Sequence, residues 1–306
     1  MKFFKEHILS AKKFDREAVL ELFDEAKKME EVFDKGKASF LEGKIMATLF
    51  FEPSTRTRFS FETAMQRLAG GVVSNPDMKV TSSSQKMETL EDTAKTVSQM
   101  VDVMVVRHPD PHSVGRMAAF SDCPMINAGD GINEHPTQAL LDLYTIWKER
   151  GEIDGLKIAL VGDLKNGRVP HSQIELLKLF DVNIWLVSPE GLKIPEELKQ
   201  GINNLNELEN LEDVIGDMDV IEMTRVQKER FVNEKEYEKY AGSYALNSKL
   251  IEKMGKKALV LHPLPRVEEI SRDIDNDHRA MYFKQVRNGV VLRMALLKKV
   301  LTEQNE

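Results

Sequence analysis

Short apolar runs alternate along the chain with segments whose apolar residues recur at a helical period. The runs are continuous rather than alternating, which is typical of strands covered on both faces. They span residues 45–51, 103–106, 158–161, 182–187, 220–223 and 258–261. Helical stripes lie between and around them, at 19–29, 61–68, 140–147 and 290–301. Strands that alternate with helices in this order predict parallel sheets with right-handed crossovers.

The pattern starts afresh in the middle of the chain. A helix is expected over 136–150, and a glycine-bounded turn at 151–155 precedes a new strand. We therefore predict an α/β protein with two doubly wound parallel-sheet domains joined by interdomain helices. The expected domains are 1–136, completed by a C-terminal helix over 288–306, and 137–287. A length of 306 residues agrees with two domains of roughly 150 residues each.

Composition excludes several classes of protein. The 43 basic and 50 acidic residues give a net charge of −7, which argues against nucleic acid or an anionic membrane as a partner. The single cysteine, Cys123, cannot form an internal disulfide, which favours a reducing compartment. No apolar run reaches the roughly 18 residues that a membrane span needs. We expect a cytoplasmic protein.

Parallel sheets bind ligands at the carboxyl ends of their strands, so the residues after each predicted strand are candidates. Ser54 can cap the helix whose stripe begins at Phe61. The first turn of that helix holds Arg56 and Arg58 but no acid before Glu62, although cations there oppose the helix dipole by about 0.3–1 kcal/mol each. Hydroxyls, free amides and an arginine together suit a phosphate group. The alternative is a plain cap with its arginines in solvent.

Other predicted strands also end in cationic or polar side chains. Arg107, Arg168 and Arg225 follow three of them, and the stiff loop 263–266 follows the last. A turn-rich loop is expected over 127–131, and after it His135 and Gln138 lie three residues apart at a helix start. Each feature has an ordinary alternative, namely a surface charge, a capping histidine or a proline turn. Together they indicate a small substrate with more than one anionic group.

Nucleotide and metal chemistry are weakly supported. The loop 162–168 has the glycine spacing of a P-loop but lacks its Lys-Ser/Thr pair, and no G-x-G-x-x-G sequence occurs. The strand ends show no nucleophile–base–orienter triad and no metal-ligand cluster. We therefore expect no metal and no cofactor.

Four motifs together resemble the transcarbamylase family over essentially the whole chain. They are Ser-Thr-Arg-Thr-Arg at 54–58, His-Pro-Thr-Gln at 135–138, Met-Thr-Arg-Val-Gln at 223–227 and His-Pro-Leu-Pro at 262–265. Members that use ornithine typically carry cysteine where this chain has Pro263. Arg225 and Gln227 suit a dicarboxylate, so the resemblance favours members that use aspartate.

The resemblance implies transfer of the carbamoyl group of carbamoyl phosphate to the amino group of L-aspartate, in de novo pyrimidine biosynthesis. It implies four catalytic residues, Arg56, Thr57, Arg107 and His135. The implied carbamoyl phosphate site comprises Ser54, Thr55, Arg56, Thr57, Arg107, His135, Gln138, Pro263 and Leu264. The implied aspartate site comprises Lys86, Arg168, Arg225 and Gln227, with Ser82 and Lys86 supplied by a neighbouring subunit of a homotrimer. Separate regulatory chains are a possible further partner.

The chain departs from the usual family pattern at Met87, Glu134, Asn166 and Glu222. Glu134 adds a negative charge beside an anion site, and the other three put substrate affinity and allosteric coupling in question. Two alternatives to the aspartate reaction therefore stay open. One is a sister transcarbamylase with another amine acceptor such as ornithine, and the other is a non-catalytic anion-binding or regulatory homologue.

Overall fold

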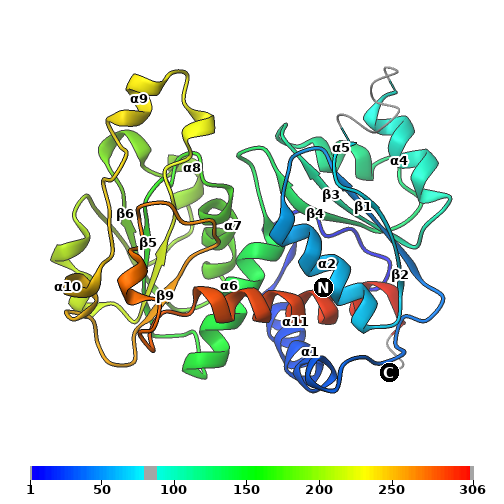
Figure 1. The fold of residues 1–306 in the computed structure, drawn as a ribbon, viewed down its shortest axis with the longest axis horizontal. Coiled ribbons are helices and arrows are strands. Elements are labelled where there is room, and N and C mark those ends of the chain that lie inside the picture. The colour runs from blue at the N-terminus through cyan, green and yellow to red at the C-terminus, as the bar shows by residue number, and fades with distance from the viewer. Residues whose placement is uncertain (1, 79–87, 304–306) are drawn as a thin grey trace. The chain divides into compact units, whose positions relative to one another are not determined.

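The computed structural model describes residues 2–78 and 88–303 (Figure 1). Backbone contacts divide the chain into two compact units. Unit 1 comprises Met1–Tyr144 with Val286–Glu306, and unit 2 comprises Thr145–Gln285. The divisions fall inside helices α6 (Pro136–Arg150) and α11 (Tyr282–Leu301), so each of these helices contributes to both units.

Unit 1 contains a four-stranded parallel sheet in the order β2-β1-β3-β4. Its strands are β1 (Ile45–Phe50), β2 (Gly71–Asn75), β3 (Val103–His108) and β4 (Met125–Asp130). Its helices, besides parts of α6 and α11, are α1 (Arg16–Lys35), α2 (Thr55–Arg67), α4 (Leu90–Ser98) and α5 (Ser113–Ala118), with a 3-10 turn η1 (Ala11–Lys13) before them. This sheet confirms the doubly wound, parallel architecture for the first half.

Unit 2 contains a five-stranded parallel sheet in the order β7-β6-β5-β8-β9. Its strands are β5 (Lys157–Val161), β6 (Asn183–Val187), β7 (Leu205–Leu208), β8 (Val220–Met223) and β9 (Leu259–Leu261). Its shorter helices are α7 (Arg168–Leu177), α8 (Glu196–Lys199), α9 (Glu234–Glu238) and α10 (Ser248–Ile251). Its 3-10 turns are η3 (Glu190–Leu192), η4 (Leu211–Asp213), η5 (Ile215–Asp217), η6 (Lys228–Arg230) and η7 (Arg272–Ile274).

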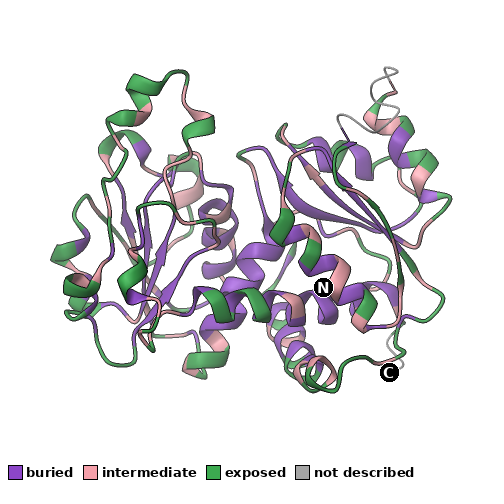
Figure 2. Cartoon of the chain, viewed as in Figure 1, coloured by how far each residue is buried: buried purple, intermediate pink, exposed green. Residues whose placement is uncertain are grey.

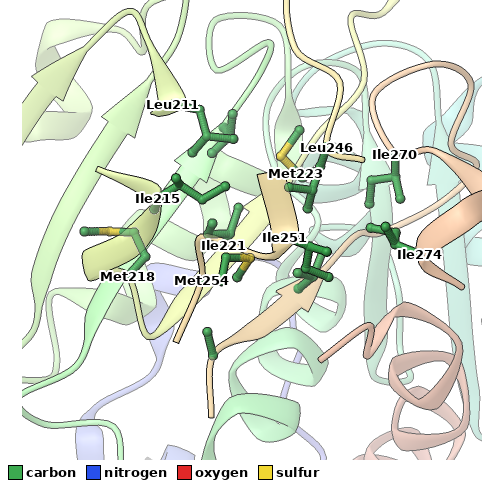
Figure 3. Packing of buried hydrophobic residues seen from close by; sticks show 14 of the residues in the cluster. Leu211, Ile215, Met218, Ile221, Met223, Leu246, Ile251, Met254, Ile270 and Ile274 are labelled. Carbon is green, nitrogen blue, oxygen red and sulfur yellow. The ribbon is translucent and has the colours of Figure 1, made fainter. Parts of the chain in front are cut away.

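Strands β1, β3, β5, β6, β8 and β9, which the continuous apolar runs predicted, are largely buried (Figure 2). In unit 2, Ile221 and Met223 of β8 pack with Ile215, Leu246 and Ile251 in one hydrophobic cluster (Figure 3). Burial of such side chains is worth about 1.5–3 kcal/mol each, so the cluster anchors the strand that ends beside Arg225.

Three strands carry no apolar run long enough to predict them. β2 and β7 are sheet edges with partly exposed residues, so they need fewer apolar side chains. β4 overlaps a segment, 127–131, whose asparagine, glycines and aspartate predict a loop, and that prediction was wrong. The Asn127 side chain donates to the carbonyl of Leu9 at 3.0 Å and accepts from the amide of Gly129 at 2.8 Å, so a turn-forming residue is satisfied inside a buried strand.

The N-terminal segment explains why β4 tolerates burial at the edge of its sheet. The amide of Ile8 donates to the carbonyl of Met125, and the amide of Asn127 donates to the carbonyl of Ile8, both at 2.8 Å. These bonds cover part of the outer edge of β4, so the carbonyl of Met125 and the amide of Asn127 are paired there. None of the described helices is long and apolar enough to cross a membrane.

Candidate active site

Helix α2 begins at Thr55, directly after β1, as the sequence predicted. Ser54 occupies the N-cap position in an extended conformation, with φ −158°, but its side chain forms no capping hydrogen bond to the described backbone of the helix. Thr57 is buried in the first turn, and that turn contains no acidic residue. The first amides of α2 are therefore left without the usual side-chain cap, which is the arrangement that suits an anion.

Arg107 lies beside this helix start because β3 pairs with β1. Its Cα is the register partner of Phe50, and its carbonyl accepts the amide of Phe51 at 2.8 Å. The guanidinium Nε lies 3.4 Å from the Glu52 carboxylate, and Nη1 donates to the carbonyl of Ala128 at 3.5 Å. Parallel pairing thus brings Arg107 and the β1–α2 turn to one edge of the sheet.

His135 and Gln138 lie at the start of α6, which begins at Pro136 as predicted. His135 is 3% exposed. The Gln138 side-chain nitrogen donates to Asp142 Oδ1 at 2.8 Å. This bond orients the amide and leaves its oxygen as an acceptor, the group that would bind the NH₂ of the substrate that the resemblance implies.

Arg293 of α11 links the two helices that start at the candidate site in unit 1. It is 3% exposed, with Nη1 donating to Ser60 Oγ of α2 at 2.7 Å and Nη2 donating to Thr137 Oγ1 of α6 at 3.5 Å. Its guanidinium also lies over the Phe61 ring, 4.8 Å from the centroid. Burial lowers the pKa of Arg293 to about 10, although the charge of Asp142 opposes the shift.

Glu134, one of the departures from the family pattern, contacts the N-terminal segment. Its Oε1 accepts from the Ser10 hydroxyl at 2.5 Å, and its Oε2 accepts from the amide of Ala11 at 2.7 Å. The carboxylate therefore caps the 3-10 turn η1, and its charge is compensated by two donors.

In unit 2, β5 and β8 are neighbours, so the segments that follow them meet. Asp163 Oδ1 accepts the amide of Asn166 at 3.0 Å, and Oδ2 accepts the amide of Gln227 at 3.3 Å. The Gln227 side chain donates to the carbonyl of Asn166 at 3.1 Å. Burial raises the pKa of Asp163, although these hydrogen bonds oppose the shift. Asn166, another departure, thus belongs to the bridge between the two segments.

Two arginines stand at the ends of these strands. Arg168 begins α7 and is buried. Arg225 forms a two-pronged ion pair with Glu229, in which Nη1 donates to Oε2 at 3.0 Å and Nη2 donates to Oε1. This hydrogen-bonded pairing raises the pKa of Arg225 and outweighs the effect of burial. The pair uses one hydrogen on each of two Nη atoms, and a guanidinium has five N–H donors, so Arg225 can hold Glu229 and a substrate carboxylate at the same time.

The remaining predicted residues fall into two groups. Pro263 and Leu264 follow β9 in unit 2, and Leu264 adopts φ +54°. Ser82 and Lys86, and the departure Met87, lie outside the described residues. Within 2–78 and 88–303, no group of three His, Cys, Asp or Glu side chains is placed to hold a metal ion.

Comparison with protein-family models gives two adjoining matches. Residues 6–148 match the carbamoyl phosphate-binding domain of aspartate/ornithine carbamoyltransferases, and residues 154–300 match their aspartate/ornithine-binding domain. The chain belongs to the aspartate/ornithine carbamoyltransferase family.

Relatives within this carbamoyltransferase family are similar over nearly the whole chain. The aspartate carbamoyltransferase catalytic subunit of Methanocaldococcus jannaschii is 49% identical over 306 residues, covering 98% of this chain and 99% of that protein. A crystal structure of that catalytic subunit superposes with a TM-score of 0.88 at 50% identity, over 96% of this chain and 97% of that one. Aspartate transcarbamoylase of Trypanosoma cruzi, in complex with carbamoyl phosphate and aspartate, superposes with a TM-score of 0.92 at 39% identity, over 98% of each chain.

Several supporting residues of this family member were missed by sequence reasoning. Asp142 lies four residues after Gln138 on helix α6, so helical spacing offered a signal for it. Glu229 also lies four residues after Arg225, but Arg225 is in irregular chain, where that spacing carries no such signal. Arg293 falls on the apolar stripe of the last helix, where a charge is unusual and therefore informative.

Proposed function

We propose that this chain transfers the carbamoyl group of carbamoyl phosphate to the amino group of L-aspartate, giving N-carbamoyl-L-aspartate and phosphate. The observation that carries the proposal is the 49% identity, over essentially its whole length, to proteins named as aspartate carbamoyltransferase catalytic subunits. We assign the reaction to de novo pyrimidine biosynthesis in the cytoplasm. The buried, unpaired thiol of Cys123 agrees with a reducing compartment.

We assign carbamoyl phosphate to the residues around the start of α2. Ser54, Thr55, Arg56 and Thr57, with Arg107, bind the phosphate through amides, hydroxyls and guanidinium groups. Thr57, Arg107 and His135 donate hydrogen bonds to the carbamoyl oxygen. The oxygen of Gln138 and the carbonyls of Pro263 and Leu264 accept from the carbamoyl NH₂. Support comes from the uncapped first turn of α2 and from the orientation that Asp142 imposes on Gln138.

We assign L-aspartate to unit 2. Arg168, Arg225 and Gln227, with Lys86, bind its two carboxylates, and lysine could not replace the arginine forks without loss. The ion pair with Glu229 holds the Arg225 guanidinium in one orientation before substrate arrives. Glu229 therefore acts as a positioning residue for Arg225.

The reaction that these residues support is an acyl-type transfer without a covalent enzyme intermediate. The free amine of aspartate attacks the carbamoyl carbon, and the carbonyl oxygen becomes an oxyanion. The bond from carbon to the phosphate oxygen then breaks, phosphate leaves with the bonding electrons, and it accepts the proton lost by the amine. Each donor to the oxyanion lowers the activation free energy by roughly 2.7–4 kcal/mol. Holding the two anionic substrates in reactive contact supplies much of the remaining rate enhancement.

A direct assay tests the function and separates its alternatives. The purified chain is incubated with carbamoyl phosphate and either L-aspartate or L-ornithine, and products are identified by mass spectrometry alongside released phosphate. We expect carbamoyl aspartate and an equal amount of phosphate above the rate of spontaneous hydrolysis. Citrulline in place of carbamoyl aspartate would identify a sister transcarbamylase. Tight binding of N-(phosphonacetyl)-L-aspartate without turnover would identify a non-catalytic homologue.

We further propose a homotrimer whose sites are shared, with Ser82 and Lys86 entering the neighbouring subunit's site. Mixing the inactive variants Arg56→Ala and Lys86→Ala under conditions of subunit exchange should restore part of the activity, because some mixed sites then carry neither substitution. A mixture that exchanges subunits yet stays inactive contradicts the shared site. Copurification with a separate chain would identify a regulatory partner.

A further inference from the structure

A buried histidine–glutamate pair lies directly behind the loop that follows β9. His262 is 2% exposed and Glu269 is 7% exposed. Nδ1 of His262 accepts the backbone amide of Leu264 at 2.7 Å, and Nε2 lies 2.7 Å from Glu269 Oε1. The sequence drew attention to this loop for its prolines, and neither the histidine nor the glutamate has a role in the reaction described above.

The hydrogen bonds determine the protonation of the pair. A backbone amide can only donate, so Nδ1 of His262 carries no proton, and Nε2 carries the proton that it donates to Glu269. Burial lowers the pKa of His262, which agrees with a neutral ring, although the contact with Glu269 opposes the shift. Burial would raise the pKa of Glu269, but its hydrogen bonds outweigh that effect and leave it lowered. The pair therefore consists of a neutral His262 imidazole hydrogen-bonded to an ionised Glu269 carboxylate.

Glu269 also forms hydrogen bonds within the segment that follows β9. Its carboxylate accepts the amides of Val267, at 3.1 and 3.2 Å to the two oxygens, and of Glu268 at 3.1 Å. Leu264 holds φ +54°, a conformation that residues other than glycine rarely adopt unless their surroundings impose it. The pair thus supplies hydrogen bonds to both ends of the segment 262–269.

The geometry of one peptide group connects the pair to the Pro263 carbonyl, which the proposed function assigns to the carbamoyl NH₂. The amide of Leu264 and the carbonyl of Pro263 belong to the same planar trans unit, so they point in opposite directions. When His262 fixes the direction of the Leu264 amide, it also fixes the direction of the Pro263 carbonyl, away from the imidazole. Pro263 and Pro265 have no amide hydrogens, so neither residue can donate a backbone hydrogen bond to the carbonyls of this loop.

We propose that His262 and Glu269 are positioning residues that aim the Pro263 carbonyl at the carbamoyl NH₂, and so set the preference for a carbamoyl over an acyl group. This inference rests on the proposed function. It predicts a selective defect when the pair is broken: recognition of the NH₂ group weakens, whereas recognition of the phosphate does not.

Two substitutions of the same histidine separate its two contacts. His262→Asn places an amide oxygen near the position of Nδ1 and keeps an acceptor for the Leu264 amide. His262→Gln places its amide nitrogen near the position of Nε2, so it keeps the donor to Glu269 but loses that acceptor. We measure the KM for carbamoyl phosphate, and the inhibition constants of acetyl phosphate, in which CH₃ replaces NH₂, and of inorganic phosphate.

For H262Q we expect the KM for carbamoyl phosphate to rise about ten-fold, or about 1.4 kcal/mol, with both inhibition constants within two-fold of wild type. For H262N we expect a rise of less than about three-fold, because the acceptor is retained. The proposal is overturned if H262Q weakens the binding of carbamoyl phosphate and of acetyl phosphate equally, or if it leaves the ratio of the KM for carbamoyl phosphate to the inhibition constant of acetyl phosphate unchanged.

A folding control keeps the test decisive. Thermal melting is recorded for each variant, and an unchanged inhibition constant for phosphate reports an intact phosphate site. If H262Q does not fold, the KM for carbamoyl phosphate and the inhibition constant of acetyl phosphate are compared in Glu269→Gln. This substitution replaces one carboxylate oxygen by an NH₂ group, which faces the donors on His262, Val267 and Glu268. We expect weaker binding of carbamoyl phosphate alone, and an unchanged ratio of the two constants overturns the proposal. Absence of turnover in the wild-type chain would instead refute the proposed function.

Discussion

The two units hold their candidate site residues in different ways. In unit 1 these residues lie on strand ends and on the first turns of α2 and α6, and both helices are also held by a distant part of the chain, through the bonds of Arg293 to Ser60 and Thr137. In unit 2 Arg225 lies in irregular chain between β8 and η6, followed by the exposed helix α9 (Figure 2). Its partner Glu229 comes from the same loop.

The two kinds of support differ because the hydrophobic core fixes strands and helices but not irregular loops. The position of a residue on a strand end or a first helical turn is fixed by the packing of that strand or helix, so the contacts that hold it also stabilise the core. A residue in an irregular loop has no such packing and depends on local charged and hydrogen-bonded partners. We therefore expect supporting substitutions in unit 1 to affect stability and turnover together, and those in unit 2 to affect mainly the affinity for the amine substrate.

The largest effect is expected at the start of α2. Arg56→Ala removes a cation proposed to hold the phosphate, and we expect kcat to fall by at least about 10²-fold. The control is Arg116→Ala, an exposed arginine of the same unit that pairs with Glu91, and it should retain near-normal activity. Near-normal activity of the Arg56 variant would refute the assignment of the phosphate site.

Arg293→Met tests the shared supports of unit 1. It removes charged hydrogen bonds to α2 and α6, so we expect about 2–3 kcal/mol lower stability in urea unfolding followed by far-UV circular dichroism, together with reduced kcat. Arg287→Met, on the same helix but half-exposed and paired with Asp34, should change stability by less than about 0.5 kcal/mol. Equal unfolding midpoints for the two variants would contradict the role of Arg293.

Glu229→Gln tests the local support in unit 2. Without its carboxylate partner the Arg225 guanidinium loses its fixed orientation, and we expect about a ten-fold higher KM for aspartate, with the KM for carbamoyl phosphate unchanged. Lys228→Gln alters the neighbouring residue, which pairs with exposed Glu234, and should leave both constants unchanged. A variant in which both KM values rise would show that the loop serves the two substrates together.

The smallest effect concerns acid stability in unit 2. Hydrogen bonds from Arg266 and Tyr282 lower the pKa of Asp275 to about 2, despite some burial. A lowered carboxyl pKa stabilises the folded state above the unfolded value near 4, and this contribution is lost as the pH falls from about 4 to 2. The two tryptophans, Trp147 and Trp185, both lie in unit 2, so their fluorescence follows its unfolding.

Asp275→Asn supplies the comparison for this measurement. The variant should be less stable than the parent at neutral pH and should lose less stability between pH 4 and 2, because the titrating group is absent. An identical slope of stability against pH in both proteins would assign the acid sensitivity to other carboxylates, such as Asp277, whose pKa is also about 2 beside Arg279.

Sequence reasoning predicted the parallel architecture because a strand covered on both faces must be apolar throughout. It also identified the residues after β1, β3, β5, β8 and β9, since parallel strands present their carboxyl ends at one edge. It failed at β4, where the polar groups of Asn127 are satisfied by Leu9, a residue more than a hundred positions away. No local pattern carries that information.

The sequence by itself therefore determined the two sheets, their strand-end chemistry and the family. These depend on local periodicity and on short motifs, which act over a few residues of chain. Only the tertiary structure decided what holds that chemistry in place: Arg293 between Ser60 and Thr137, and Glu134 on the turn at Ser10. Those contacts join groups separated by more than a hundred residues, and burial makes each of them necessary, because a polar group removed from water must find a partner wherever the fold brings one.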